Sequence, residues 1–256
     1  MIDRLIAWLY RLRDRILTSR GIKWLERNYP QFEKFLLDRF SVLHFGGLPL
    51  TALVTALGLN ILLLFKFTEK VMNSKTVTAI DTGIARYFFS IRSDGFARLV
   101  FNFTQVGNEF FIAGLTIVLA VYCIFRKMYV YLIPLLFTVL GSGLTITAGK
   151  NVFKKNRPDE FAFYPEHSFS FPSGHSTIAV ALYGFLAYLL IRHQTNRATR
   201  TAIFLSCISL IGAIGLSRIY LCVHYLSDVI GGYLLGFAWL ILAVTFVEWN
   251  LRKVKN

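Results

Sequence analysis

Long apolar stretches alternate with short polar connections over most of the chain. A helix needs about 20 residues to cross the ~30 Å hydrocarbon core of a bilayer. Six stretches approach or reach that length, over roughly 43–65, 109–125, 129–149, 175–191, 202–217 and 226–247. The pattern therefore predicts an all-α integral membrane protein, in which residues 43–250 form a bundle of six transmembrane helices.

Residues 1–42 follow a different pattern. Apolar side chains recur at spacings of three and four from Ile2 to Ile16, and again from Ile22 to Leu36, with Arg and Lys between them. Such stripes predict basic amphipathic helices that lie in the headgroup region. A helical hairpin docked on a partner domain is the alternative. The segment lacks the uninterrupted apolar run of a signal peptide, so no cleavage is expected.

Residues 66–108 carry too many charges to cross a bilayer. Apolar patches within them, such as IARYFF at 84–89, predict short interfacial helices that cover one mouth of the bundle. Gln105, Asn108 and Glu109 are weaker candidates for side chains that line this mouth.

Composition supports a membrane protein and excludes several other classes. Hydrophobic residues make up 55% of the chain and charged residues 16%, and the mean hydropathy is +0.54. These values exclude disorder, collagen-like repeats and a disulfide scaffold. The net charge of +14 would suggest nucleic acid in a soluble protein. In this chain the net charge indicates contact with anionic lipid, positively charged cytoplasmic loops or binding of an anionic substrate. No nucleic-acid partner is expected.

The positive charge is divided unequally between the two sides of the predicted bundle. One side holds 17 of the 28 Lys and Arg, in residues 1–42 and in the connections that contain Arg126, Arg192 and Arg252. The positive-inside rule places that side in the cytoplasm. The other side carries the motifs described next, so we expect the active site on the outer face of a bacterial cytoplasmic membrane.

Three polar segments stand out on the outer side, each at the end of a predicted span. They are KNVFKKNRP at 150–158, PSGH at 172–175 and SRIYLCVHYLSD at 217–228. Polar groups at membrane depth are costly, so they are candidates for a functional site. Lys154 and Lys155 in the first segment are expected to form a solvated face, with attraction of a lipid headgroup as the alternative. His167, between the first two segments, is expected to be a solvated loop residue.

Spacing within the motifs indicates how some side chains meet. His224 and Asp228 are four residues apart on a helix, so the carboxylate can accept from one ring nitrogen of the histidine. Arg218 lies six residues before His224, so a turn must separate them if both face one pocket. Lys150 and Arg157 share a helical face only if their helix continues to Pro158, where it is expected to end.

The residue types indicate phosphoryl transfer. Two histidines, one backed by a carboxylate, suit covalent acid–base catalysis, although the spacing does not decide which histidine attacks. Three cations suit a centre with several negative oxygens. They are Lys150, Arg157 and Arg218. Backbone N–H groups and the Ser173 hydroxyl, at the helix start that includes Gly174, can point into the same centre. Asp228 alone is a poor Mg²⁺ ligand set, so no metal is expected.

The patterns K-x6-R-P, P-S-G-H and S-R-x5-H-x3-D resemble the three-part signature of the type 2 phosphatidic acid phosphatase (PAP2) superfamily, and six spans resemble its membrane branch. The resemblance implies that His224 attacks phosphorus and becomes phosphohistidine. It implies that Asp228 orients and charges that ring, and that His175 protonates the leaving oxygen and then activates water. The implied phosphate-binding residues are Lys150, Arg157, Ser173, Gly174 and Arg218.

The expected function is hydrolysis of a lipid phosphomonoester or diphosphate, with no cofactor. Undecaprenyl diphosphate, phosphatidylglycerol phosphate and phosphatidate are all compatible substrates, since each places its headgroup at the interface and its tail in the bilayer. Transfer of the phosphoryl group to another lipid is the nearest alternative. A lipid transporter or scaffold without catalysis, and a vanadium haloperoxidase, are the more distant ones.

Overall fold

The computed structural model describes residues 24, 28–31, 39 and 45–255, and this part is helical, without strands. The chain divides into two compact units, residues 1–56 with 252–256 and residues 57–251. The motif segments all belong to the second unit. The amphipathic helices predicted for residues 1–42 lie outside the described residues, apart from isolated positions.

The helices follow the predicted apolar stretches. Their bounds are α4 Leu48–Asn73, α5 Lys75–Ile91, α6 Asp94–Thr104, α7 Glu109–Phe125, α8 Tyr129–Phe153, α9 Gly174–Ile178, α10 Gly184–Arg192, α11 Arg197–Tyr220 and α12 Leu226–Lys255. A π-helical turn, Ala179–Tyr183, joins α9 to α10, and two short 3₁₀ turns lie at Gln105–Gly107 and Asp159–Phe161.

Length and composition allow five helical segments to cross a bilayer. They are α4, α8, the continuous run Gly174–Arg192, α11 and α12 as far as Leu251. A sixth span exists if Asp94–Gly107 and α7, which meet at an angle of 41°, count together. The all-helical membrane fold is thus confirmed. The predicted span at 109–125 is long enough only together with residues 94–107, which were expected not to cross.

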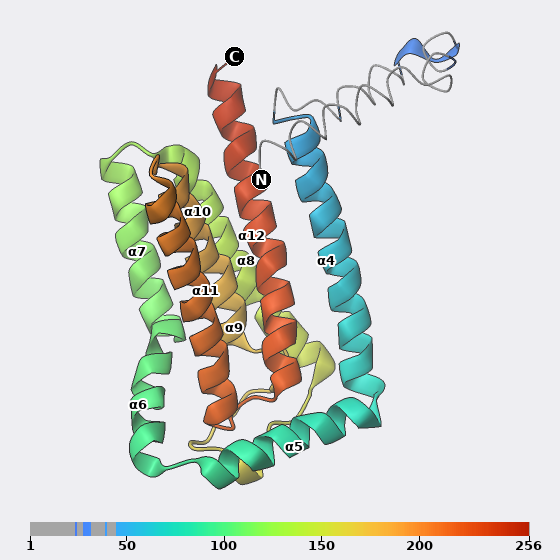
Figure 1. The fold of residues 1–256 in the computed structure, drawn as a ribbon, viewed down its shortest axis with the longest axis vertical. Coiled ribbons are helices and arrows are strands. Elements are labelled where there is room, and N and C mark those ends of the chain that lie inside the picture. The colour runs from blue at the N-terminus through green and yellow to red at the C-terminus, as the bar shows by residue number, and fades with distance from the viewer. Residues whose placement is uncertain (1–23, 25–27, 32–38, 40–44, 256) are drawn as a thin grey trace. The chain divides into compact units, whose positions relative to one another are not determined.

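Helix α5 lies across one end of the second unit, at a steep angle to α8 and α11 (Figure 1). Ser74 caps its first turn by accepting from Val77 N. Most of its apolar side chains are exposed, including Ile80 and Tyr87, as expected for a helix at a membrane interface. Its buried residues are Ala85 and Asp81, and Asp81 is a charged residue whose side chain is only 4% exposed.

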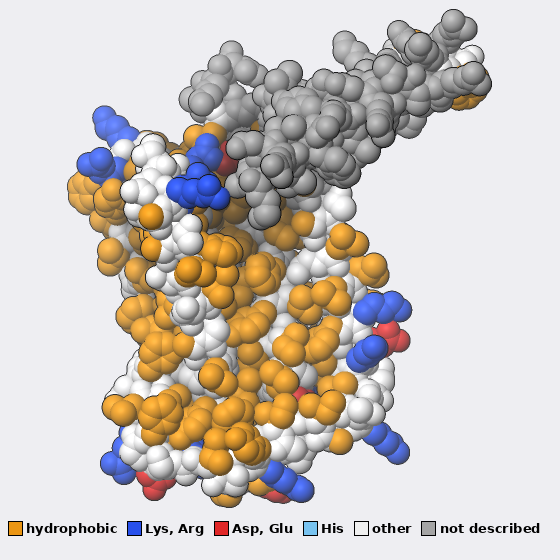
Figure 2. Space-filling view, viewed as in Figure 1, with side chains coloured by type: hydrophobic (Ala, Val, Ile, Leu, Met, Phe, Trp, Pro, Cys, Tyr) orange, Lys and Arg blue, Asp and Glu red, His pale blue; other side chains and the backbone are white. Residues whose placement is uncertain are grey.

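The motif segments lie at one end of the second unit, and the connections after α7 and α10 lie at the other. The connections that contain Arg126 and Arg197 lie at the end away from α5, whereas residues 154–173 and 221–225 lie near α5 (Figure 1). Figure 2 shows hydrophobic side chains covering the flank of the helices between these ends. Such a belt is what a lipid-facing surface requires.

Glycines let α12 approach the start of α9 closely. A Cβ atom at Gly232 would lie 2.7 Å from Ser173 O, and one at Gly236 would lie 2.4 Å from Thr177 O. Because both neighbours are backbone atoms, larger residues would force the two helices apart. This packing fixes the second motif against the helix that carries Asp228.

Candidate active site

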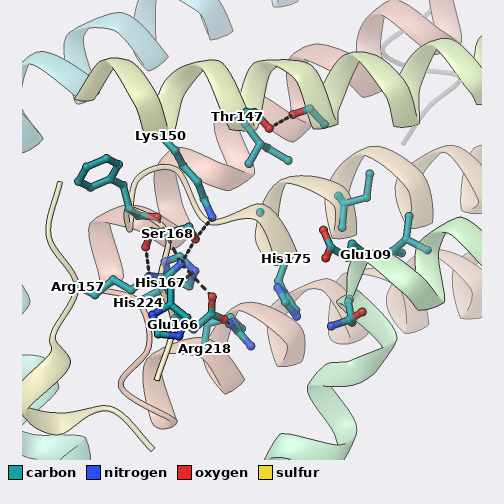
Figure 3. A pocket seen from close by; sticks show the side chains of 18 of the residues that line it. Glu109, Thr147, Lys150, Arg157, Glu166, His167, Ser168, His175, Arg218 and His224 are labelled. Carbon is teal, nitrogen blue, oxygen red and sulfur yellow. Dashed lines mark hydrogen bonds and ion pairs between the residues drawn. The ribbon is translucent and has the colours of Figure 1, made fainter. Parts of the chain in front are cut away.

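The motif segments surround one cavity of about 710 Å³ in the second unit (Figure 3). Six of the eight predicted site residues line it, namely Lys150, Arg157, Gly174, His175, Arg218 and His224. The other two, Ser173 and Asp228, are fully buried and do not line it. Asn108 and Glu109 line the same cavity, as does the exposed His167. Gln105 is not among the lining residues.

One wall of the cavity is apolar. Side chains from α7, α8 and α9 form it, namely Ile112, Ala113, Val139, Ile146 and Ile178. These helices belong to the part of the unit whose outer surface is hydrophobic. The cavity can therefore hold a polar headgroup beside an acyl or prenyl chain.

The turn between α11 and α12 brings Arg218 and His224 to the same cavity. The chain reverses through Cys222, whose φ is 53°, and the backbone N–H groups of Val223 and His224 both donate to Arg218 O, at 3.2 and 3.4 Å. The prediction that a turn must separate these two residues is confirmed.

The two ring nitrogens of His224 face different groups. Nδ1 lies 3.5 Å from Asp228 Oδ2, and Nε2 lies 3.2 Å from Arg157 Nη1. Nδ1 makes no hydrogen bond within the described part of the chain, so the expected hydrogen bond to Asp228 is not formed and the carboxylate acts on the ring as a nearby charge. Burial, followed by the positive charges of Arg157 and Arg218, holds the pKa of His224 well below its usual range. The ring is therefore neutral at pH 7 and keeps a lone pair for attack.

Asp228 is fixed from several directions. Its Oδ2 accepts from Tyr225 N at 2.8 Å, and its Oδ1 accepts from Lys155 Nζ at 2.9 Å. Its backbone oxygen accepts from Ser173 N at 3.1 Å, which ties the third motif to the second. The carboxylate thus has little freedom to leave the His224 ring.

Arg157 reaches the cavity from a loop. Helix α8 ends at Phe153 because Lys154 adopts a left-handed conformation, with φ of 45°, and its N–H returns to Lys150 O. The helix thus ends five residues before Pro158, so Lys150 and Arg157 do not share one helical face. Arg157 Nε donates to Ser168 O at 2.6 Å, and Lys150 Nζ donates to Ser168 Oγ at 2.9 Å. The Ser168 loop thus holds both cations beside His224.

Glu166 was not anticipated from the sequence. Its Oε1 accepts from Arg218 Nη2 at 3.0 Å, and its Oε2 lies 3.4 Å from Arg157 Nη2. Arg218 also donates to Tyr164 Oη at 2.6 Å, and its Nε has no partner among the described residues. The carboxylate occupies the place between two guanidinium groups that suits an oxyanion, so a phosphate would compete with it. The sequence places Glu166 between the first two motifs, and this position was the signal from which its role could have been predicted.

Ser173 has a different contact from the one expected. Its hydroxyl is within 3.5 Å of Ser176 N and 3.0 Å of Ser176 Oγ, so it caps the start of α9. The expectation that this hydroxyl points into the cavity is not met. His175, two residues on, lines the cavity, and its ring packs against Gly107, where a Cβ atom would lie 3.0 Å from its Cδ2.

Lys155 also departs from expectation. Its side chain is 16% exposed, and Nζ makes ion pairs of 2.9 Å with Asp81 and with Asp228. The prediction of a solvated face holds for Lys154, which is exposed, and is wrong for Lys155. No local pattern could have revealed this, because Asp81 lies 74 residues away in the chain.

The cavity suits an anion better than a metal. Three cations and two histidines converge on it, and within residues 24, 28–31, 39 and 45–255 no group of three His, Cys, Asp or Glu is placed to hold a metal ion. Such an arrangement can bind the oxygens of a phosphoryl group and place a neutral imidazole beside the phosphorus.

Comparison with known proteins identifies relatives. Residues 131–252, which include all three motifs, match the family model described as the PAP2 superfamily. The chain is 29% identical to phosphatidylglycerophosphatase B of Bacillus subtilis over 192 residues, covering 74% of this chain and 94% of that protein. It is 35% identical to a lipid A 1-phosphatase of Rhizobium johnstonii over 129 residues, covering 46% of this chain and 48% of the relative.

A solved structure has a similar fold. The crystal structure of a transmembrane PAP2-type phosphatidylglycerolphosphate phosphatase from Bacillus subtilis superposes with a TM-score of 0.70 at 27% identity. The similarity covers 75% of this chain and 96% of that one.

Proposed function

We propose that this chain, which belongs to the PAP2 superfamily and is a membrane lipid phosphatase, hydrolyses its substrate through a phosphohistidine on His224. One observation carries the proposal. His224 is a buried imidazole with Nε2 towards the cations of the cavity and Nδ1 towards the carboxylate of Asp228. A nucleophile needs this orientation, because the ring becomes cationic when Nε2 bonds to phosphorus.

The first half of the reaction transfers the phosphoryl group to the enzyme. His224 Nε2 attacks phosphorus in line with the leaving oxygen, and a P–N bond forms as the P–O bond to the lipid breaks. His175 donates a proton to the departing oxygen. Asp228 stabilises the charge on the phosphorylated ring. Arg157, Arg218 and Lys150 bind the remaining oxygens as negative charge accumulates on them. Glu166 gives up its place between the two arginines to the substrate.

The second half returns the phosphoryl group to water. His175, now neutral, removes a proton from a water molecule that attacks phosphorus from the side that the lipid has left. The P–N bond breaks, phosphate is released, and His224 is again a neutral imidazole. Each group therefore ends the cycle as it began.

We propose phosphatidylglycerol phosphate as the substrate. The apolar wall beside the cations suits a lipid whose phosphate reaches the interface. The relative that the chain matches over most of its length is named phosphatidylglycerophosphatase B. Undecaprenyl diphosphate, phosphatidate and the 1-phosphate of lipid A are the competing substrates.

Phosphate release from a panel of these lipids tests the reaction. The purified chain in detergent should release phosphate fastest from phosphatidylglycerol phosphate. It should do so in excess EDTA, and vanadate should inhibit it because it mimics five-coordinate phosphorus. Loss of activity in EDTA that Mg²⁺ restores would contradict the mechanism. Label recovered on a second lipid instead of in free phosphate would indicate phosphotransfer.

We propose that the cavity opens to the outer face of a bacterial cytoplasmic membrane. The support is the distribution of Lys and Arg along the sequence, since 17 of the 28 lie in residues 1–42 and in the segments that contain Arg126, Arg192 and Arg252, away from the motifs. In intact cells, a membrane-impermeant thiol reagent should label a cysteine placed at Glu160 and not one placed at Asn196, both of which are exposed. The unsubstituted chain gives the background from its own cysteines, and permeabilised cells should show both labels. The reverse pattern would place the site in the cytoplasm.

A further inference from the structure

A second buried ionic cluster lies against Asp228, away from the cavity. Lys155 Nζ is 2.9 Å from Asp228 Oδ1, 2.9 Å from Asp81 Oδ2 and 2.6 Å from Ser227 Oγ. Asp81 also accepts from Ser227 N at 3.0 Å and from Ser227 Oγ at 2.5 Å. The side chain of Asp81 is 4% exposed and that of Asp228 is 0% exposed. The lysine is therefore shared by two carboxylates that have almost no contact with solvent.

The charge of the cluster depends on Lys155. With the lysine present, two carboxylates and one ammonium leave a single negative charge beside His224. Without it, two buried carboxylates would face each other, and one of them would take up a proton. The ammonium also lies 4.7 Å from the centre of the Tyr225 ring, which favours a cation at this point.

Asp81 comes from a part of the chain that the family match does not include. It lies on α5, whereas the match begins at residue 131. Its two oxygens are both used, one on the Ser227 backbone and one on the Lys155 ammonium. Helix α5 is thereby connected to the start of α12, three residues after His224, through a contact that also fixes the lysine.

We infer that Lys155 and Asp81 are positioning residues for the phosphohistidine reaction. Lys155 keeps Asp228 ionised and aimed at His224, and Asp81 holds Lys155 in place. The inference rests on the proposed function, because only a ring that becomes cationic needs the charge of Asp228. Neither residue touches the cavity, so both act through Asp228.

A pair of lysine variants tests the inference. Lys155→Met should lower kcat by roughly 10–100-fold, the usual effect of losing a group that orients a catalytic one, and leave KM within about twofold. Lys154→Met is the matched control, since it removes the neighbouring positive charge from an exposed side chain. It should change neither constant by more than about twofold. The rate of phosphoenzyme formation should fall with kcat in Lys155→Met.

The pH dependence separates a charge effect from a structural one. In Lys155→Met, kcat should recover as the pH rises, because alkali restores the charge that Lys155 maintains on Asp228. Other groups near Asp228 remain in the variant. They are Asp81 from α5, His224 and Tyr225 from the turn before α12, and Arg157 beyond the His224 ring. Lys155→Arg keeps a cation and should retain more activity than Lys155→Met.

A double variant makes the test decisive if Lys155→Met folds poorly. Asp81→Asn combined with Lys155→Met removes one carboxylate together with the ammonium, so Asp228 no longer faces a second carboxylate without a cation between them. The double variant should be faster than Lys155→Met. A purely structural tether predicts the opposite, since both connections between α5 and α12 are weakened.

Two results would overturn the inference. One is a Lys155→Met enzyme with the kcat of Lys154→Met, and the other is a double variant no faster than the single one at any pH. If the unsubstituted enzyme formed no phosphoenzyme, the proposed function itself would fail. That outcome is distinguishable because it requires no variant.

Discussion

Replacing His224 by alanine should abolish the covalent intermediate and lower turnover by at least about 10⁴-fold. The expectation follows from removal of the nucleophile, whose loss leaves only the contribution of substrate binding. The enzyme reacts with a lipid that carries a labelled phosphate, and the reaction is stopped without acid. The measurement is the amount of acid-labile label on the protein. His224→Ala should carry none at any time.

His175→Ala is the comparison that separates the two histidines. General acid catalysis contributes roughly 10²–10⁴-fold, and it matters most for a poor leaving group such as a lipid alkoxide. The variant should therefore lose more activity on lipid than on an aryl phosphate, whose leaving group needs no proton. Label trapped in His224→Ala but absent from His175→Ala would reverse the assigned roles.

Replacing Arg218 by methionine should lower kcat/KM by roughly 10²–10³-fold, as the loss of a preorganised charge at a transition state does. The side chain is 1% exposed, and its Nε has no partner in the described part of the chain. Arg218 therefore lines the cavity as a buried cation, and one of its donors is unpaired. Vanadate should inhibit the variant much more weakly than it inhibits the unsubstituted enzyme.

Two further variants serve as comparisons for Arg218→Met. Arg218→Lys should recover little activity, because an ammonium lacks the planar fork that binds two oxygens at once. Arg200→Met removes an exposed arginine from the other end of α11 and should leave kcat/KM unchanged. An Arg218→Met enzyme that retains vanadate inhibition and the same melting temperature would show that Arg218 does not bind the phosphoryl group.

The sequence by itself determined the elements and the chemistry. Apolar stretches of about 20 residues predict helices because backbone groups in lipid must be satisfied within their own segment. The residue types of the three motifs predict an anion site with two histidines, and the four-residue spacing predicts that Asp228 lies near His224. The two residues do lie 3.5 Å apart, but His224 belongs to the turn before α12 and not to the helix that the spacing assumed. These inferences depend on local order along the chain, which is why they can be made from the sequence alone.

Only the tertiary structure decided which distant groups meet. Glu166 lies between Arg157 and Arg218, and Lys155 is buried between two carboxylates, one of them on α5. Local patterns cannot predict such pairs, because they arise when separate helices pack and the charges between them lose their water. The left-handed residue at Lys154 has the same origin, since it aims Arg157 at a cavity that other segments complete.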